Sequence, residues 1–231
     1  MKEPKSRHVD LSHEVGDGMV TYKGLPAPVI CDFLSRTDSL KFYSEGTSFQ
    51  IGRIDMVANT GTYVDAPFHR FADGKDLSEL SLNSLADVSG IVIRRSNAGK
   101  REIDREVFLP FEVTGKAVLV ETGWCRHWRT EQYFEGHPFL TRAAAEYLRD
   151  QGATLVGIDS YNIDDTDDGT RPVHTVLLGA GIPICEHMCN LHLLPLKDFT
   201  FTAAPVKVKG MGTFPVRAFA TLRAGPAGDG S

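Results

Sequence analysis

The sequence predicts an α/β fold built around one mixed sheet. Strand signals come first: residues 8–15 alternate around Val9, Leu11 and His13, and residues 48–68 are rich in β-branched and aromatic residues. Strand-like and helix-like segments then alternate from residue 87 to residue 188, as in α/β proteins. The 231 residues contain no interdomain linker, so we expect one domain, residues 1–231, with its core at about residues 8–222 and flexible tails.

Two helices are marked by their end signals. Residues 139–152 contain three consecutive alanines, Thr141 is suited to cap the helix at its start, and Gly152 follows the last turn. Residues 171–181 predict a shorter helix, with Pro172 in its first turn and glycines at its end.

The remaining regular segments are predicted strands, because each carries a short apolar run bounded by turn residues. They are residues 87–96, 115–124, 153–163 and 182–188, followed by two β-segments around a Gly-rich turn in residues 201–222.

Composition excludes several classes of protein. The net charge of −5 gives no basic surface for nucleic acid or an anionic membrane. No apolar run approaches the roughly 18 residues that a membrane span needs, and the first residues have no signal-peptide core. The four cysteines form no CxxC pair, which indicates reduced thiols in a cytoplasmic protein. We therefore expect a small-molecule substrate as the partner.

The segment "NTGTYVDAPFHRF", residues 59–71, concentrates polar side chains. If residues 59–65 are extended, Asn59, Tyr63 and Asp65 share one face, and Gly61 leaves room for close approach. Pro67 then bends the chain before His69, and the sequence does not show on which side His69 lies. A half-solvated edge strand explains the same pattern, so this segment alone does not define a site.

A second group of polar residues follows the later strands. Glu186 ends an otherwise apolar strand, where a buried carboxylate needs a metal, an arginine or a proton. His174 lies in the first turn of a predicted helix. Together with Asp65, these residues supply one imidazole and two carboxylates, a set that can hold a divalent metal ion. We interpret most of the acidic run at residues 164–168 as a turn with solvated carboxylates.

The segment "TGTYVDAPFH" resembles the signature H-x-G-T-H-x-D-x-P-x-H of the cyclase-like metal-dependent amidohydrolases, of the kynurenine formamidase and isatin hydrolase type. Two signature histidines fall on Asn59 and Tyr63 in this chain. The likeness extends over residues 8–222, through "ETGW", "LVGIDSYNID", "RPVHTVLLGAGIPICE" and "PVKVKGMGTFPVRAFA". The matching signature residues are Gly61, Thr62, Asp65, Pro67 and His69.

This resemblance implies a compact β/β/α (swivelling-type) domain, assembled as a homodimer or homotetramer. It implies hydrolysis of a small amide, lactam, lactone or ester by water on Zn²⁺ or Mn²⁺. Asp65, His174 and Glu186 would bind the metal, and His69 would act as acid and base, a role suited to an imidazole titrating near neutrality.

The two replaced histidines change the expected site. We expect one divalent ion, with Mg²⁺ also possible in an oxygen-rich ligand set. Tyr63 can donate to a developing oxyanion, and Asn59 can hold a substrate carbonyl. Trp124 begins an aromatic segment, residues 124–139, that either walls the substrate pocket or forms a subunit interface.

Two other functions fit the same residues. One is a metal-independent dehydration, cyclisation or lactone formation in which Tyr63, His69 and Glu186 serve as acid and base. The other is a non-catalytic relative that binds a small molecule, since loss of two metal ligands is also how a lost activity would look.

Overall fold

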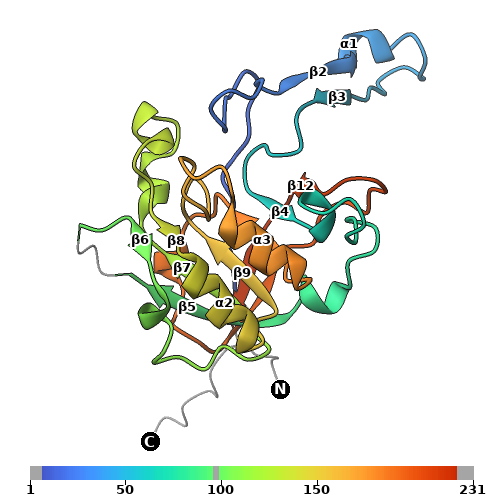
Figure 1. The fold of residues 1–231 in the computed structure, drawn as a ribbon. Coiled ribbons are helices and arrows are strands. Elements are labelled where there is room, and N and C mark those ends of the chain that lie inside the picture. Colours follow the sequence, from blue (N-terminus) through green and yellow to red (C-terminus); the bar gives the residue numbers. More distant parts are fainter. Residues whose placement is uncertain (1–6, 96–98, 223–231) are drawn as a thin grey trace, which may run out of the picture.

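A mixed sheet of nine strands organises the computed structural model, which describes residues 7–95 and 99–222 (Figure 1). The central strands β5, β7, β9 and β10 run parallel, and antiparallel strands flank them on both sides. Across the sheet the order is β1 (Arg7–Asp10), β13 (Phe219–Leu222), β11 (Phe199–Thr202), β5 (Val88–Arg94), β7 (Ala117–Glu121), β9 (Leu155–Ile158), β10 (Ile184–Glu186), β4 (Tyr63–Asp65) and β12 (Thr213–Pro215). The predicted α/β fold with a mixed sheet is confirmed.

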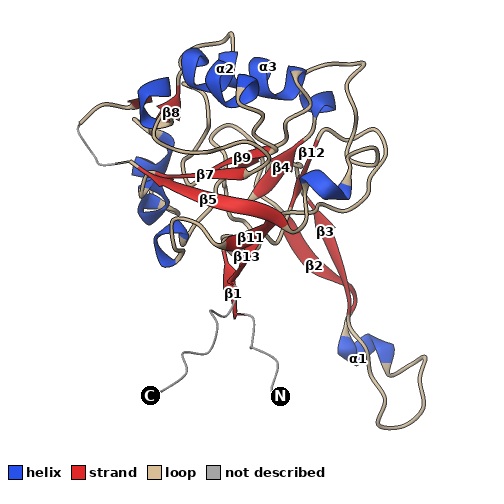
Figure 2. Ribbon diagram, turned by 90° about the horizontal axis from the view of Figure 1, so that it is seen from below, coloured by secondary structure: helices blue, strands red, loops and turns tan. Residues whose placement is uncertain are grey.

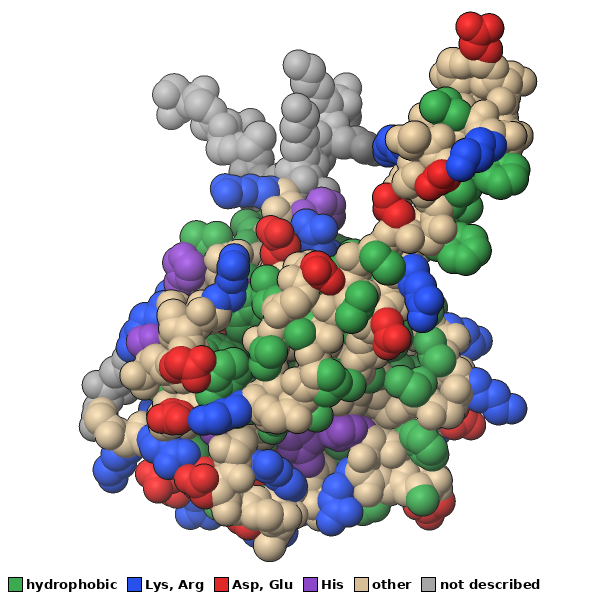
Figure 3. Space-filling view, turned by 90° about the horizontal axis from the view of Figure 1, so that it is seen from above, with side chains coloured by type: hydrophobic (Ala, Val, Ile, Leu, Met, Phe, Trp, Pro, Cys, Tyr) green, Lys and Arg blue, Asp and Glu red, His purple; other side chains and the backbone are tan. Residues whose placement is uncertain are grey.

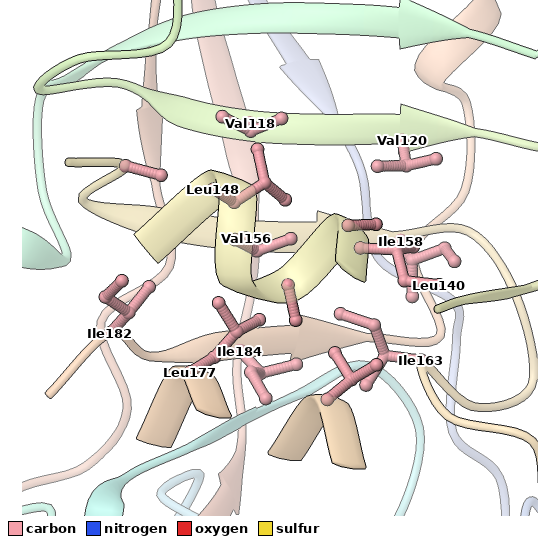
Figure 4. Close-up of a cluster of buried hydrophobic side chains, with 14 of the residues drawn as sticks. Val118, Val120, Leu140, Leu148, Val156, Ile158, Ile163, Leu177, Ile182 and Ile184 are labelled. Atoms are coloured by element: carbon pink, nitrogen blue, oxygen red, sulfur yellow. The ribbon is translucent and has the colours of Figure 1, made fainter. Parts of the chain in front are cut away.

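Helices α2 (Arg142–Asp150) and α3 (Pro172–Gly179) cover one face of the parallel strands (Figures 1 and 2). Both confirm the sequence prediction. The Thr141 hydroxyl accepts a hydrogen bond from the Ala144 amide at 3.2 Å, which caps the start of α2. Leu148 from α2 and Leu177 from α3 pack in the apolar layer between the helices and the sheet (Figure 4).

Strand alternation divides the core between the two faces of the sheet. Val118 and Val120 of β7 point into the layer under the helices, whereas Leu119 joins the core on the opposite face. That second core also contains Val9 from β1, at one edge of the sheet, and Val64 from β4, near the other edge. The sheet must therefore curl around this second core.

A two-stranded arm extends away from the body in Figures 1 and 2. It consists of β2 (Val29–Leu34), α1 (Arg36–Ser39) and β3 (Ile51–Asp55), with β2 and β3 antiparallel. Its apolar side chains are largely open to solvent; Phe33 is 76% exposed and Phe42 is 72% exposed. Neither β2 nor α1 was predicted from the sequence.

The smaller elements connect the strands of the sheet. Short parallel strands β6 (Glu102–Ile103) and β8 (Phe139–Leu140) pair beside the main sheet. The 3₁₀ turns are η1 (Pro67–His69), η2 (Leu82–Ser84), η3 (Arg105–Val107), η4 (Trp124–His127), η5 (Glu131–Phe134) and η6 (Leu191–Leu193). Within residues 7–95 and 99–222, no helix has the length and apolar character needed to cross a membrane.

Two predicted segments differ from the structure. The β-rich segment at residues 48–68 contains two strands, since β3 ends at Asp55 and β4 begins at Tyr63. Gly61, in the loop between them, takes a left-handed φ of 69°, so the extended conformation assumed for residues 59–65 is wrong before Tyr63. The two β-segments expected in residues 201–222 are three strands, β11, β12 and β13. The predicted tails, before residue 8 and after residue 222, lie outside the described residues except for Arg7.

Candidate metal centre and substrate cavity

Strand register gathers the polar side chains on the helix-covered face of the sheet. In the antiparallel pair of β4 and β10, Glu186 lies opposite Tyr63. In the pair of β4 and β12, Thr213 lies opposite Asp65. Residues directly opposite each other point to the same face, and so do Tyr63 and Asp65, two positions apart. These four side chains therefore meet in one place although they come from three strands.

Asp164 orients His174 from the loop before α3. The Asp164 carboxylate accepts hydrogen bonds from the amides of Val173 at 2.7 Å and His174 at 3.0 Å. It also pairs with His174 Nδ1 at 2.6 Å. This contact leaves Nε2 free on the side of the sheet, 3.6 Å from Asp65 Oδ2 and 3.9 Å from Glu186 Oε1. A carboxylate behind a histidine is the usual support for a metal-binding imidazole.

Three side chains bring possible metal ligands together: Asp65, His69 and His174 each offer one atom, and these atoms lie within 4.8 Å of one another. The turn η1 carries His69 back toward Asp65, and Thr213 Oγ1 bonds both the Asp65 carboxylate and His69 Nδ1, the latter at 2.9 Å. Asp65 Oδ2 is buried without a hydrogen-bond partner among the described residues. An unpartnered buried carboxylate oxygen beside two imidazoles fits a divalent ion.

The protonation states of His174 and Asp65 depend on neighbouring charged and polar groups as well as on burial. Burial disfavours the charged form of His174, but Asp164, Asp65 and Glu186 outweigh it and raise the pKa of His174 to about 10. Burial also works against ionised Asp65, yet the charges of His69 and His174 and the Thr213 hydroxyl hold its pKa below the ordinary value. The cationic His174 imidazole thus faces the ionised Asp65 carboxylate, with Nε2 3.6 Å from Oδ2.

Glu186 is satisfied by protein donors on both oxygens. The Tyr63 hydroxyl donates to Oε2 at 2.6 Å, and the Ile163 amide donates to Oε1 at 2.6 Å. Burial raises the pKa of Glu186, and burial beside that carboxylate raises the pKa of Tyr63 well above its ordinary value. Tyr63 is therefore a protonated hydrogen-bond donor at neutral pH.

A cavity of about 250 Å³ opens over this centre. Histidine side chains are visible in the middle of the body in Figure 3, with Lys and Arg side chains beside them. Asn59 lines the cavity, whereas Trp124 is not among its described lining residues; the Trp124 indole donates to the Tyr133 carbonyl at 3.0 Å. The lining consists of Tyr22, Leu25, Asn59, Tyr63, His69, Arg70, Asn162, Arg171, His174 and Glu186.

Comparison with known proteins identifies the family. The model of the family described as "Putative cyclase" matches residues 9–165. The chain belongs to this cyclase family.

Relatives of this cyclase-family chain include two kynurenine formamidases. That of Bacillus cereus is 30% identical over 181 residues, which cover 75% of this chain and 81% of the relative. That of Bacillus anthracis is 26% identical over 220 residues, covering 92% and 96%.

Solved structures of similar fold cover nearly the whole chain. A potential metal-dependent hydrolase with cyclase activity has a TM-score of 0.78 at 25% identity, covering 96% of this chain and 100% of that one. Isatin hydrolase A from Labrenzia aggregata, bound to benzyl benzoate, has a TM-score of 0.80 at 21% identity, with 94% of each chain covered. This second likeness shows a shared fold.

Sequence reasoning missed two residues of the cyclase-family centre. Asp164 was expected in a solvated turn, but it is fully buried and holds His174. The one signal in the sequence was that Asp164 directly follows the apolar Ile163, which is fully buried. Thr213 carried no signal of its own, because only the pairing of β12 with β4 places it against Asp65.

Proposed function

We propose that this cyclase-family chain is a metal-dependent hydrolase that cleaves a C–N or C–O bond of a small amide, lactam, lactone or ester. The observation that carries this function is the convergence of His69 and His174, which line the cavity, with the buried Asp65 behind them, whose Oδ2 makes no hydrogen bond to a described residue. Similarity to kynurenine formamidases and to a potential metal-dependent hydrolase supports the same reaction class.

The ligand set favours Zn²⁺ or Mn²⁺ over Mg²⁺. Two imidazoles and one carboxylate suit the first two ions, whereas Mg²⁺ prefers oxygen ligands. A divalent ion held by these residues supplies a water of lowered pKa and polarises a carbonyl. Glu186, the third ligand expected from the sequence, remains a candidate through Oε1, which lies 3.9 Å from His174 Nε2.

The remaining residues of the chain bind substrate and move protons. His69 keeps Nδ1 on the Thr213 hydroxyl and lies at the solvent-open side of the cavity, so its Nε2 either joins the ligand set or exchanges a proton with the substrate. Tyr63 lies in the cavity wall with its single O–H donated to Glu186, so it would stabilise an oxyanion by turning that donor from the carboxylate to the substrate. Asn59 offers its amide to a substrate carbonyl from the same wall.

The Tyr63–Glu186 hydrogen bond of 2.6 Å favours a second candidate function. A tyrosine bonded to a carboxylate of raised pKa is an acid–base pair that needs no metal, as in a dehydratase or cyclase. Turnover that survives complete chelation, and is lost in Tyr63→Phe, would support this candidate over the metal-dependent hydrolase.

Metal analysis of the purified chain tests the hydrolase directly. We expect about one equivalent of Zn²⁺ or Mn²⁺ in the wild type and a small fraction of it in Asp65→Asn, because the variant loses the charged ligand. Hydrolysis of the neutral probe formanilide should stop on chelation and return when the ion is added back. Asp150→Asn is the control, since Asp150 is a surface residue that pairs with its neighbour Arg149. If the purified wild type contains no divalent metal and gains no hydrolase activity when metal is added, this function is contradicted.

We further propose a cytoplasmic homo-oligomer in a swivelling-type β/β/α fold, as the resemblance implies. The exposed apolar side chains of the arm support self-association, because such surfaces usually mark interfaces. The four free cysteines fit a reducing compartment. Light scattering on the purified protein measures the assembly, and a single-chain mass at micromolar concentration would contradict it.

A further inference from the structure

Two arginines face the candidate cavity without an acidic partner. Arg70 and Arg171 both line the cavity. Among residues 7–95 and 99–222, no carboxylate lies within ion-pair distance of either guanidinium. The chain has more acidic than basic residues, with a net charge of −5, so a shortage of carboxylates in the chain does not explain why these two arginines lack an acidic partner.

The nearby acidic residues are engaged elsewhere. The Asp165 carboxylate pairs with Arg101 at 2.9 Å, and Arg171 reaches only the Asp165 carbonyl oxygen, at 2.8 Å. The Asp168 carboxylate accepts hydrogen bonds from the amide and the hydroxyl of Thr170. The acidic turn therefore positions the Arg171 side chain through its backbone while its carboxylates bond other groups.

The two arginines are held in place from the same helix turn. Thr175, the residue after His174, accepts a hydrogen bond from Arg70 Nε at 3.2 Å and donates one to the Arg171 carbonyl at 2.8 Å. Arg171 takes a left-handed φ of 48°, which is uncommon for a residue other than glycine. Such strain is often kept where a side chain must point in a particular direction.

From these observations, and building on the proposed hydrolase, we infer that the substrate carries a carboxylate group that binds Arg70 and Arg171 while its scissile carbonyl faces Asp65 and His174. Guanidinium groups suit a carboxylate because their planar donors match its two oxygens. The cavity of about 250 Å³ limits the substrate to a small molecule, and Leu25 and the Tyr22 ring add apolar surface to its lining. Neutral amides and lactones are then poorer substrates than their carboxylate-bearing counterparts.

Binding of benzoate and of the uncharged, similarly shaped benzamide tests this subsite. Isothermal titration is carried out on the purified full chain and repeated after chelation, since a carboxylate also binds a divalent ion. We expect benzoate to bind at least about tenfold more tightly than benzamide in both preparations, the range of a charge-assisted hydrogen bond. Added salt should weaken benzoate and leave benzamide unchanged.

Arginine variants provide the decisive comparison. Arg171→Gln should weaken benzoate about tenfold, the more exposed Arg70→Gln about threefold, and benzamide should not respond. Arg105→Gln is the matched control, because Arg105 pairs with Glu106 and does not line the cavity. Equal binding of the two probes, or equal effects of all three variants, would overturn the inference.

The subsite and the hydrolase can fail separately. A chain that holds metal and hydrolyses formanilide, but binds benzoate without help from either arginine, overturns only the carboxylate subsite. A chain whose arginines select benzoate over benzamide after chelation supports the subsite, even where metal analysis contradicts the hydrolase.

Discussion

Two buried histidines, His174 and His187, have opposite charge preferences. The pKa of His174 is raised to about 10, whereas the pKa of His187 is lowered to about 3. Burial disfavours the charged form of both rings. Three carboxylates outweigh it at His174, while Tyr22, Tyr63, Trp128, Tyr133 and Tyr161 surround His187 with aromatic rings. The partners of a buried imidazole, more than its depth, therefore decide whether it carries charge.

The surroundings of His174 favour a cation, whereas the surroundings of His187 exclude charge. Neither ring nitrogen of His187 is hydrogen-bonded to a described residue, and the Tyr133 hydroxyl beside it also lacks a partner there. Around His174, Asp65 and Asp164 supply the negative charge that a metal ion needs. Substitutions in each region should thus have different signatures.

Asp164→Asn should have the largest effect. It removes the carboxylate that holds His174 Nδ1, and loss of such a support weakens metal binding by about 10–100-fold. Competition with a chromogenic chelator measures this affinity. Asp165→Asn is the matched control, since the next carboxylate in the chain pairs with Arg101 instead. Equal metal affinities in the two variants would remove the distinction between the two regions.

Tyr63→Phe should have the next largest effect, on stability. The variant leaves Glu186 Oε2 buried without its donor, which destabilises the fold by about 1–3 kcal/mol. Loss of that bond also raises the pKa of Glu186 further, so the folded state binds its proton more tightly than the unfolded state. The deficit, measured by urea unfolding of the chelated protein, should therefore be larger at pH 8 than at pH 5.

Tyr147→Phe is the control for Tyr63→Phe, since the Tyr147 hydroxyl makes no hydrogen bond to a described residue and the ring is only partly buried. We expect a change below about 0.5 kcal/mol there. Similar, pH-independent losses in both tyrosine variants would show that Glu186 does not depend on the Tyr63 donor.

His187→Phe should have the smallest effect at neutral pH, below about 1 kcal/mol, because an apolar ring replaces a neutral one among aromatic neighbours. The difference should appear in acid. The unfolded chain protonates His187 below about pH 6.5, whereas the folded chain resists until about pH 3, so the wild type loses stability as the pH falls through this window. The variant should lose about 2 kcal/mol less between pH 7 and pH 5.

Urea unfolding at several pH values follows this change. His192→Phe is the control, because His192 is exposed. An acid slope identical in the wild type and in His187→Phe would contradict neutral burial of His187. His13, whose pKa burial lowers to about 4, keeps part of the acid sensitivity in every variant.

Site residues at the ends of regular elements were easier to predict from the sequence than those whose position depends on a turn or on pairing between distant strands. Asp65 and Glu186 stand at strand ends, and capping residues predicted α2 and α3, because these signals are local. The position of His69 depended on the turn at Pro67, and that of Thr213 on pairing between distant strands. The arm escaped prediction because its apolar residues face solvent, contrary to the burial on which periodicity arguments depend.

Pairing of β12 with β4 has a consequence for the order of folding. Thr213 bonds Asp65 across a separation of 148 residues, so one wall of the centre leaves the ribosome long after the other. Contacts this distant in the chain form late, after the cost of closing the intervening loop has been met. We therefore expect the ion to enter a nearly finished protein. It would slow unfolding by mass action on the native state and leave the rate of folding almost unchanged.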